Sequence, residues 1–167
     1  MTAAPISIRL AGPTDLERIS DIYNHYVIHS ECTYQETPST LHERSEWFAA
    51  HGAAYPVTVG ELDGSIVAWG SISQFRPRSA YSKTVENSIY VQPDMQRMGI
   101  GSAMLLDLLD RAKRADHHTM LALIDSRQTV SIALHHRHGF VEVGHLKEVG
   151  FKFEQWLDVV YLQKMLI

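Results

Sequence analysis

The chain has 167 residues, of which 45% are hydrophobic and 20% charged, and this fits one globular domain over residues 1–167 with a continuous core. Its formal net charge of −4 lacks the basic excess that binding to nucleic acid or an anionic membrane requires, so we expect a small-molecule partner. The single cysteine, Cys32, excludes an intrachain disulfide, and we find no apolar run of membrane-spanning length and no signal peptide. We therefore expect a cytoplasmic protein.

Hydrophobic periodicity predicts strands and helices that follow one another along the whole chain. In chain order, the expected elements are a strand at 6–12, helices at 13–28 and 40–51, strands at 56–62, 65–75 and 84–91, a helix at 100–115, a strand at 119–124, a helix at 131–138, and strands at 140–146 and 158–166. This order predicts a single α/β sheet domain with helices on both faces.

Local signals indicate where several of these elements begin and end. Thr14 with Glu17 matches a capping box, in which a side-chain oxygen and a carboxylate satisfy the first N–H groups of a helix. Thr40 with Glu43 repeats this pattern ahead of the second helix. The Asp-Gly pair at residues 63–64 predicts a tight hairpin turn between two strands.

The helix at 100–115 has the strongest pattern in the chain. Its apolar residues fall on one stripe, and Asp107 and Arg111 are placed to pair on the opposite face. The short helix at 131–138 is expected to end at Gly139, which stands in the position where helices commonly use a glycine.

Two glycines lie between the strand at 84–91 and the strongest helix, in the stretch "MQRMGIGSAMLL". Glycines at such a junction let backbone N–H groups approach a phosphate, because no Cβ blocks the way and the helix N-terminus carries partial positive charge. A Walker loop is excluded by its missing Gly-Lys-Ser/Thr, and a dinucleotide fingerprint by Met104, which stands where a third glycine is needed. A strand-to-helix turn without a ligand is the alternative interpretation.

Residues 96–101, "QRMGIG", match the Q/R-x-x-G-x-G/A loop of the GCN5-related N-acetyltransferase (GNAT) superfamily. Four further stretches extend the likeness over nearly the whole chain: "IYNHYVIHSECTYQETP", "RPRSAYSKTVENSIYVQPDMQRMGIG", "DSRQTVSIALHHRHGF" and "VGFKFEQWLDVVYLQKML". Together they resemble the branch that acetylates phosphinothricin and methionine sulfoximine or sulfone.

The resemblance implies a GNAT fold, a mixed and mostly antiparallel sheet that splays between its fourth and fifth strands. It also implies acetyl-CoA as co-substrate, the α-amine of a small amino-acid-like compound as acceptor, direct transfer without a covalent enzyme intermediate, and a homodimer. Two alternatives stay open, namely a GNAT enzyme for another amine (a peptide N-terminus, a polyamine or an antibiotic) and a non-catalytic acyl-CoA-binding module.

Two residues are implied to carry the chemistry. Glu86, in "TVEN", matches the general-base glutamate of the family, and a desolvated carboxylate can accept a proton from an amine near neutral pH. His135 stands where many members have a tyrosine thought to protonate the leaving thiolate, and a histidine could donate that proton. A capping histidine or one that contacts the cofactor is the alternative for His135.

The resemblance also implies residues that bind the two substrates. Those expected to bind acetyl-CoA are Ile89, Tyr90, Val91, Arg97, Met98, Gly99, Ile100, Gly101, Ser102, Gln128, Ser131 and Arg137. Those expected to bind the acceptor are Tyr34, Arg76, Pro77, Arg78 and Glu86, with Arg76 gripping a carboxylate as a planar bidentate donor. Gln128 stands where the family often has an asparagine, and it keeps the amide on a longer side chain.

Ten histidines and the run "HHRH" raise the question of a metal site. His135 and His138 are three residues apart, but the sequence places no carboxylate or further ligand beside them. We therefore expect no bound metal.

Overall fold

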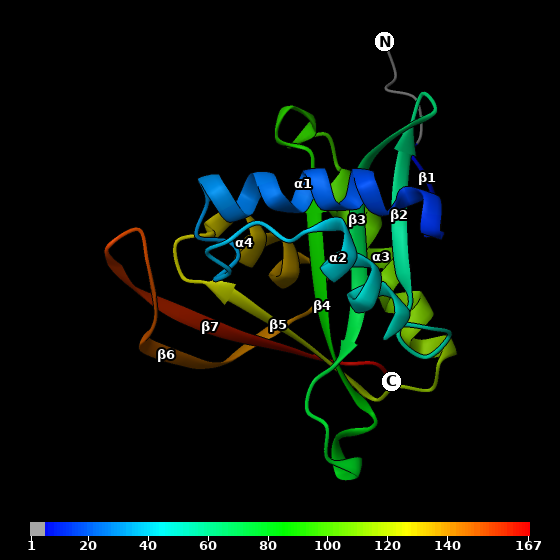
Figure 1. The fold of residues 1–167 in the computed structure, drawn as a ribbon. Coiled ribbons are helices and arrows are strands. Elements are labelled where there is room, and N and C mark those ends of the chain that lie inside the picture. Colours follow the sequence, from blue (N-terminus) through cyan, green and yellow to red (C-terminus); the bar gives the residue numbers. More distant parts are fainter. Residues whose placement is uncertain (1–5) are drawn as a thin grey trace.

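The computed structural model describes residues 6–167, which form one sheet flanked by helices (Figure 1). The strands are β1 (Ser7–Leu10), β2 (Val57–Leu62), β3 (Ser65–Gln74), β4 (Thr84–Val91), β5 (Thr119–Asp125), β6 (Val141–Lys152) and β7 (Gln155–Met165). The α-helices are α1 (Leu16–His29), α2 (Leu41–Ala49), α3 (Ile100–Arg114) and α4 (Thr129–Arg137). The predicted succession of elements is confirmed.

The sheet has the strand order β1-β2-β3-β4-β5-β7-β6 and is antiparallel except between β4 and β5. Figure 1 shows α1 and α2 on one face of the sheet and α3 and α4 on the other. The predicted mixed sheet with helices on both faces is confirmed. Among the described residues, no helix combines the length and the apolar character needed to cross a membrane.

The two parallel strands diverge after a short stretch of pairing. Thr84–Glu86 of β4 lie opposite Thr119–Leu121 of β5, and the ladder between these strands stops there. Beyond that point β4 stays paired with β3, and β5 stays paired with β7 up to Asp125. Each strand therefore keeps one unpaired edge, and the predicted splay between the fourth and fifth strands is confirmed.

Neighbouring residues of β3 pack against opposite helical layers, as the two-residue period of a strand requires. Trp69 is 2% exposed and packs with Ile19 and Ile22 of α1 on one face. Gly70 lies on the other face, where an added Cβ would come within 3.1 Å of Leu108 of α3. The sheet thus separates two cores, one under α1 and α2 and one under α3.

One predicted capping box is confirmed and the other is wrong. Thr40 Oγ1 accepts from the N–H of Glu43 (3.2 Å), and the Glu43 carboxylate accepts from the N–H of Thr40 (2.7 Å), at the start of α2. Ahead of α1, a short 3₁₀ turn runs through Asp15, whose carboxylate accepts from the N–H of Gly12 (2.7 Å) and from Arg9. The α1 entrance therefore uses Asp15, because its carboxylate also pairs with an arginine.

Positive φ angles mark the tight turns. Asp63 (φ 50°) and Gly64 (φ 76°) form the predicted hairpin between β2 and β3, and Gly139 (φ 83°) follows α4 as predicted. Strands β6 and β7 extend further than predicted and meet in a hairpin at Phe153 (φ 50°) and Glu154 (φ 58°). Neither residue type signals such a turn, so the sequence pattern does not show it.

Candidate active site

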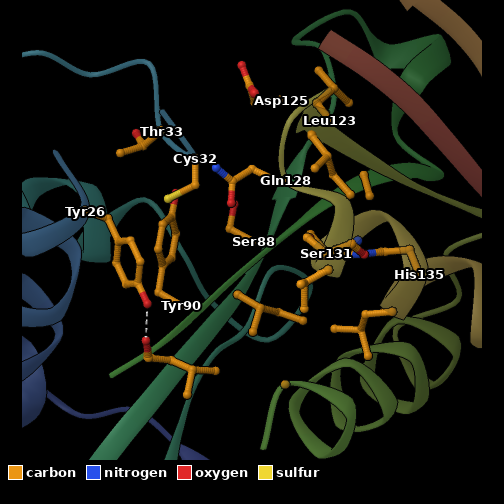
Figure 2. Close-up of a pocket in the computed structure, with 18 of the residues that line it drawn as sticks. Tyr26, Cys32, Thr33, Ser88, Tyr90, Leu123, Asp125, Gln128, Ser131 and His135 are labelled. Carbon is orange, nitrogen blue, oxygen red and sulfur yellow. Dashed lines mark hydrogen bonds between the residues drawn. The ribbon is translucent and has the colours of Figure 1, made fainter. Parts of the chain in front are cut away.

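The divergence of β4 from β5 opens a cavity of about 680 Å³ between these strands and the helices α3 and α4. Figure 2 shows Tyr26 and Tyr90 on one side of this cavity and Ser131 and His135 of α4 on the other. Most residues predicted to form the site line it: Tyr34, Glu86, Ile89, Tyr90, Val91, Arg97, Gly99, Gly101, Ser102, Gln128, Ser131, His135 and Arg137. The fold therefore gathers one cavity from segments that are far apart in the sequence.

The turn ahead of α3 presents unpaired N–H groups to this cavity. Its backbone takes the left-handed conformation at Arg97 (φ 63°) and Gly99 (φ 82°). The N–H of Ala103 donates to the carbonyl of Gly99 (3.1 Å) at the start of α3. Within the part of the chain that the structure describes, the N–H groups of residues 97–102 donate to no protein acceptor. With the positive end of the α3 dipole, they form a cradle suited to a phosphate.

Side chains in the same turn have different surroundings. Ile100 is 4% exposed and packs in the core, and Met98 is half-exposed, so neither side chain lines the cavity. The Ser102 hydroxyl lies 2.7 Å from Nε2 of His138, which fixes its direction. Met98 and Ile100 can contribute to a phosphate site only through their backbone.

The free edge of β4 forms a second wall. Ile89, Tyr90 and Val91 pair with β3 on one side only, and their other edge faces the opening. The Tyr26 hydroxyl donates to the carbonyl of Val91, as the dashed line in Figure 2 marks, and accepts from Gln96 Nε2 (2.7 Å). Helix α1 is thus tied both to the edge of β4 and to the glycine turn.

Glu86 lies at the point where the strands part. It is the last β4 residue paired with β5, opposite Leu121, and it faces Ser73 of β3 on the other side. Its side chain is half-buried and lines the cavity, and burial raises the pKa of its carboxyl above the ordinary value. A carboxylate with a raised pKa is a stronger base, so this group can accept a proton.

His135 is 4% exposed and both of its ring nitrogens contact protein atoms. Nδ1 lies 2.8 Å from the carbonyl of Ser131, and Nε2 lies 3.1 Å from Oδ1 of Asn87. A neutral imidazole can donate to only one of these oxygens, whereas the imidazolium can donate to both. Burial opposes that charged form and lowers the pKa of His135. The Asn87 side chain is itself held by its donation to the carbonyl of Leu121 (3.2 Å).

The loop between α1 and α2 closes one end of the cavity. Tyr34 lies with its hydroxyl 2.9 Å from Oδ2 of the buried Asp125, and an added Cβ at Gly150 of β6 would come within 2.5 Å of its ring. Burial and the neighbouring carboxylate both raise the pKa of Tyr34. Lys152, 2% exposed, donates to the carbonyls of Ser30 and Thr33 (both 2.8 Å) and so holds this loop against β6.

Arg76, Pro77 and Arg78 lie outside the cavity. They belong to the connection between β3 and β4 and are exposed, and the Arg76 guanidinium lies 4.9 Å from the ring centre of Phe75. The structure therefore does not bring them together with Glu86 in this chain, and their role in acceptor binding stays a prediction.

Within residues 6–167, no group of three or more histidine, cysteine, aspartate or glutamate side chains is arranged to hold a metal ion. The nitrogens of His135 and His138 that could be ligands instead contact Asn87 and Ser102.

Comparison with known proteins identifies the family. A sequence model of the acetyltransferase (GNAT) domain matches residues 8–161. The chain belongs to the GNAT acetyltransferases. The L-methionine sulfoximine/L-methionine sulfone acetyltransferase of Salmonella typhimurium is 36% identical over 162 residues, which cover 96% of this chain and 95% of that protein. The phosphinothricin N-acetyltransferase of Alcaligenes faecalis is also 36% identical, over 96% of this chain and 82% of that protein.

A solved structure shows the same fold. The GNAT superfamily phosphinothricin acetyltransferase of Sinorhizobium meliloti, in complex with acetyl-CoA, superimposes with a TM-score of 0.93. It is 36% identical, and the match covers 99% of this chain and 89% of that one. The cradle and the divided strands described above fit acetyl-CoA, the co-substrate that GNAT enzymes use, because its pyrophosphate needs N–H donors and its pantetheine arm needs a strand edge.

Several residues of this GNAT site are not indicated by the sequence. In the sequence, Asn87 lies in the middle of a strand and Asp125 at the end of one, and neither position suggests a function. Tyr26 belongs to the apolar stripe of α1. Their contacts with His135, Tyr34 and Val91 join elements that are distant in the chain. The one indication in the sequence is the two-residue period of β4, which places Asn87 and Glu86 on opposite faces of the sheet.

Proposed function

We propose that this chain acetylates the α-amine of a small amino-acid-like acceptor, of the phosphinothricin, methionine sulfoximine or methionine sulfone class, by direct transfer from acetyl-CoA. The named activities of relatives at 36% identity support this acceptor class. The observation that carries the proposal is the single cavity that joins a cradle of free N–H groups at α3 to a half-buried carboxylate at Glu86.

In this proposal Glu86 removes a proton from the acceptor's ammonium group, directly or through a water molecule. The nitrogen lone pair then attacks the thioester carbon, a C–N bond forms, and the C–S bond breaks to release the thiolate of CoA. Backbone N–H groups at the unpaired edge of β4, within residues 89–91, stabilise the oxygen of the thioester as negative charge develops on it. The raised pKa of Glu86 brings its basicity closer to that of the amine.

His135 is the proposed proton donor to the thiolate. Its contacts define how it would do so, because Nε2 is held by Asn87 and Nδ1 by the carbonyl of Ser131. Two oxygen acceptors favour the protonated ring, while burial favours the neutral one. If His135 is the donor, removal of the Asn87 carbonyl should lower the pKa of the donor group in the pH dependence of kcat.

We further propose a homodimer that uses β6, β7 and the turn between them. This part of the sheet exposes apolar side chains that a monomer would leave in water: Val141, Val143, Leu146, Val149, Phe151, Phe153 and Trp156. Leu146 and Val149 also line the cavity, so a second copy seated here would cover its rim. A single cysteine supports a cytoplasmic location as part of the same proposal.

The position of Arg76 favours a second candidate function. Arg76 is exposed and lies outside the cavity, and an acceptor amine without a carboxylate would need no contact with it. Such an acceptor would make the chain a GNAT enzyme for amines in general.

One experiment distinguishes these functions. Thiol release from acetyl-CoA is measured for wild type and Arg76→Ala, with methionine sulfone and with the amine that lacks its carboxylate. If Arg76 grips the carboxylate, the variant should lose roughly 30-fold or more in kcat/KM on the amino acid and little on the amine. Equal activity of wild type on both acceptors would support the general amine acetyltransferase.

A further inference from the structure

A second cavity, of about 250 Å³, lies between α2 and the α1/α2 face of the sheet. Its lining includes Tyr23, Glu43, Arg44, Trp47, Trp69 and Ser88. We refer to it as the Arg44 chamber. It is separate from the phosphate cradle, which lies by the N-terminus of α3.

Arg44 is buried in this chamber without an anionic partner. The residue is 4% exposed, and its guanidinium carbon lies 4.4 Å from the ring centre of Tyr23, 4.8 Å from that of Trp47 and 5.7 Å from that of Trp69. Among the described residues, no carboxylate pairs with it and its Nε donates to no acceptor. Arginine stays charged at neutral pH, so the chain keeps a buried cation that lies against three aromatic rings.

The acidic side chain that lines the chamber forms no ion pair with Arg44. Glu43 also lines the chamber, but its carboxylate accepts from the N–H and the hydroxyl of Thr40 (2.7 and 2.9 Å) at the start of α2. Burying an uncompensated charge is costly, and burial accordingly lowers the pKa of Arg44. A ligand that supplies an oxygen acceptor would relieve this cost.

The remaining polar groups of the chamber are also suited to an oxygen-bearing ligand. Ser71 and Ser88 lie opposite each other in the β3–β4 ladder, and neither hydroxyl bonds to another described side chain. Ser73 lies 3.2 Å from Nε2 of His51, whose Nδ1 lies 2.8 Å from the carbonyl of Trp47. The chamber thus combines one guanidinium with free hydroxyl donors.

The chamber adjoins the proposed reaction centre. Ser88 and Tyr90 line both cavities, and strand alternation places them on the same face of β4 as Glu86. Glu86 and Ser88 are two residues apart, which is about 7 Å along a strand. An acceptor whose amine lies at Glu86 would therefore extend its side chain past Ser88 toward Arg44.

We propose that the Arg44 chamber binds the oxygen-bearing end of the acceptor's side chain, a sulfonyl, sulfoximine or phosphinyl group, and so selects acceptors that carry such a group. This inference rests on the proposed function, because it places the acceptor's amine at Glu86. The guanidinium donates to the ligand's oxygens, and the aromatic rings around it pack against the apolar part of the side chain.

The test compares methionine sulfone with methionine, which differ only in the two oxygens on sulfur. Wild type should acetylate the sulfone with at least about tenfold higher kcat/KM, because a buried guanidinium left unpaired disfavours the thioether. Arg44→Met should lower kcat/KM on the sulfone by at least about tenfold and change it less than about threefold on methionine. Arg44→Lys should recover part of the loss, because it supplies charge without the planar fork.

A matched control is Arg111→Met, which removes an arginine on α3 that pairs with Asp107 outside both cavities. It should leave the preference for the sulfone unchanged. Equal losses of Arg44→Met on both acceptors would show that Arg44 supports the fold, and would overturn the inference.

Tryptophan fluorescence gives a second readout that needs no variant. Trp47 and Trp69 lie against the Arg44 guanidinium, so titration of wild type with methionine sulfone in the presence of CoA should change their emission in a saturable way. Titration with methionine should not do so at the same concentrations. An identical response to both compounds would overturn the inference. Absence of thiol release with any amino acid would overturn the proposed function instead, and the two failures are therefore distinct.

Discussion

Alanine at Gly101 and alanine at Gly99 should change stability in opposite directions. Gly101 lies in the first turn of α3 with an ordinary helical backbone, and an added Cβ would lie 3.4 Å from Leu134 Cδ2 and 4.0 Å from Val91 Cγ2. Both contacts are tolerable, so Gly101→Ala should gain up to about 0.5–1 kcal/mol from helix propensity. Gly99 has φ 82°, and alanine there should cost about 1–2 kcal/mol although no atom lies within 4 Å.

Binding of acetyl-CoA should respond differently. Val91 and Leu134 both line the cavity, so the Cβ of alanine at 101 would project into the space that acetyl-CoA is proposed to fill. We expect Gly101→Ala to weaken acetyl-CoA at least about tenfold, which corresponds to about 1.4 kcal/mol, while raising the melting temperature by a few degrees. Gly99→Ala should instead lower the melting temperature, because a residue with a Cβ is strained at φ 82°.

The assay pairs thermal unfolding with calorimetric titration of acetyl-CoA for both variants and wild type. Stability and affinity that fall together in Gly101→Ala would mean that the glycine serves the fold alone. An unchanged affinity in a folded Gly101→Ala protein would refute the placement of the pyrophosphate at this turn.

Three further changes have definite expected results. Glu86→Gln keeps the shape but loses the base, so kcat/KM should fall by roughly 10²- to 10⁴-fold with little change in acetyl-CoA affinity. In wild type, kcat/KM should rise with pH through the raised pKa of Glu86, because only the carboxylate accepts a proton, and this limb should vanish in the variant. Lys152→Met leaves the carbonyls of Ser30 and Thr33 unpaired and should lower the free energy of unfolding by about 2–4 kcal/mol, measured by urea titration. Trp156→Glu should shift the protein from dimer to monomer in sedimentation experiments, and a wild-type monomer would contradict the proposed interface.

The sequence predicts those features of the fold that depend on neighbours along the chain. The box formed by Thr40 and Glu43 and the turn at Asp63 and Gly64 are complete within a few residues, so their patterns are sufficient. The predicted Thr14 box is wrong although its replacement is also local, because the Asp15 carboxylate accepts from Gly12, three residues before it, and from Arg9, six residues before it.

The candidate site likewise combines features that are local in the sequence with contacts between distant residues. The glycine turn is a local motif, and it can be recognised without a fold. The surroundings of His135 cannot be recognised from the sequence alone. Asn87 is 48 residues away, and it contacts His135 only after β4 and α4 pack together. Arg44 is a related case, since an arginine on the inner stripe of a helix is unusual, but the aromatic rings that enclose it come from three separate elements.

Successive side chains of β4 face opposite helical layers, so the residues on one face can be changed without changing those on the other. Val85, Asn87 and Ile89 face the layer of α3 and α4, whereas Glu86, Ser88 and Tyr90 face α1 and α2. A laboratory evolution experiment could therefore change the acceptor by randomising Ser88 and positions on α2, with Glu86 and Tyr90 kept. The face of α3 and α4 would keep its packing, so libraries confined to these positions should contain a high proportion of folded proteins, which acetyl-CoA titration would test for retained binding.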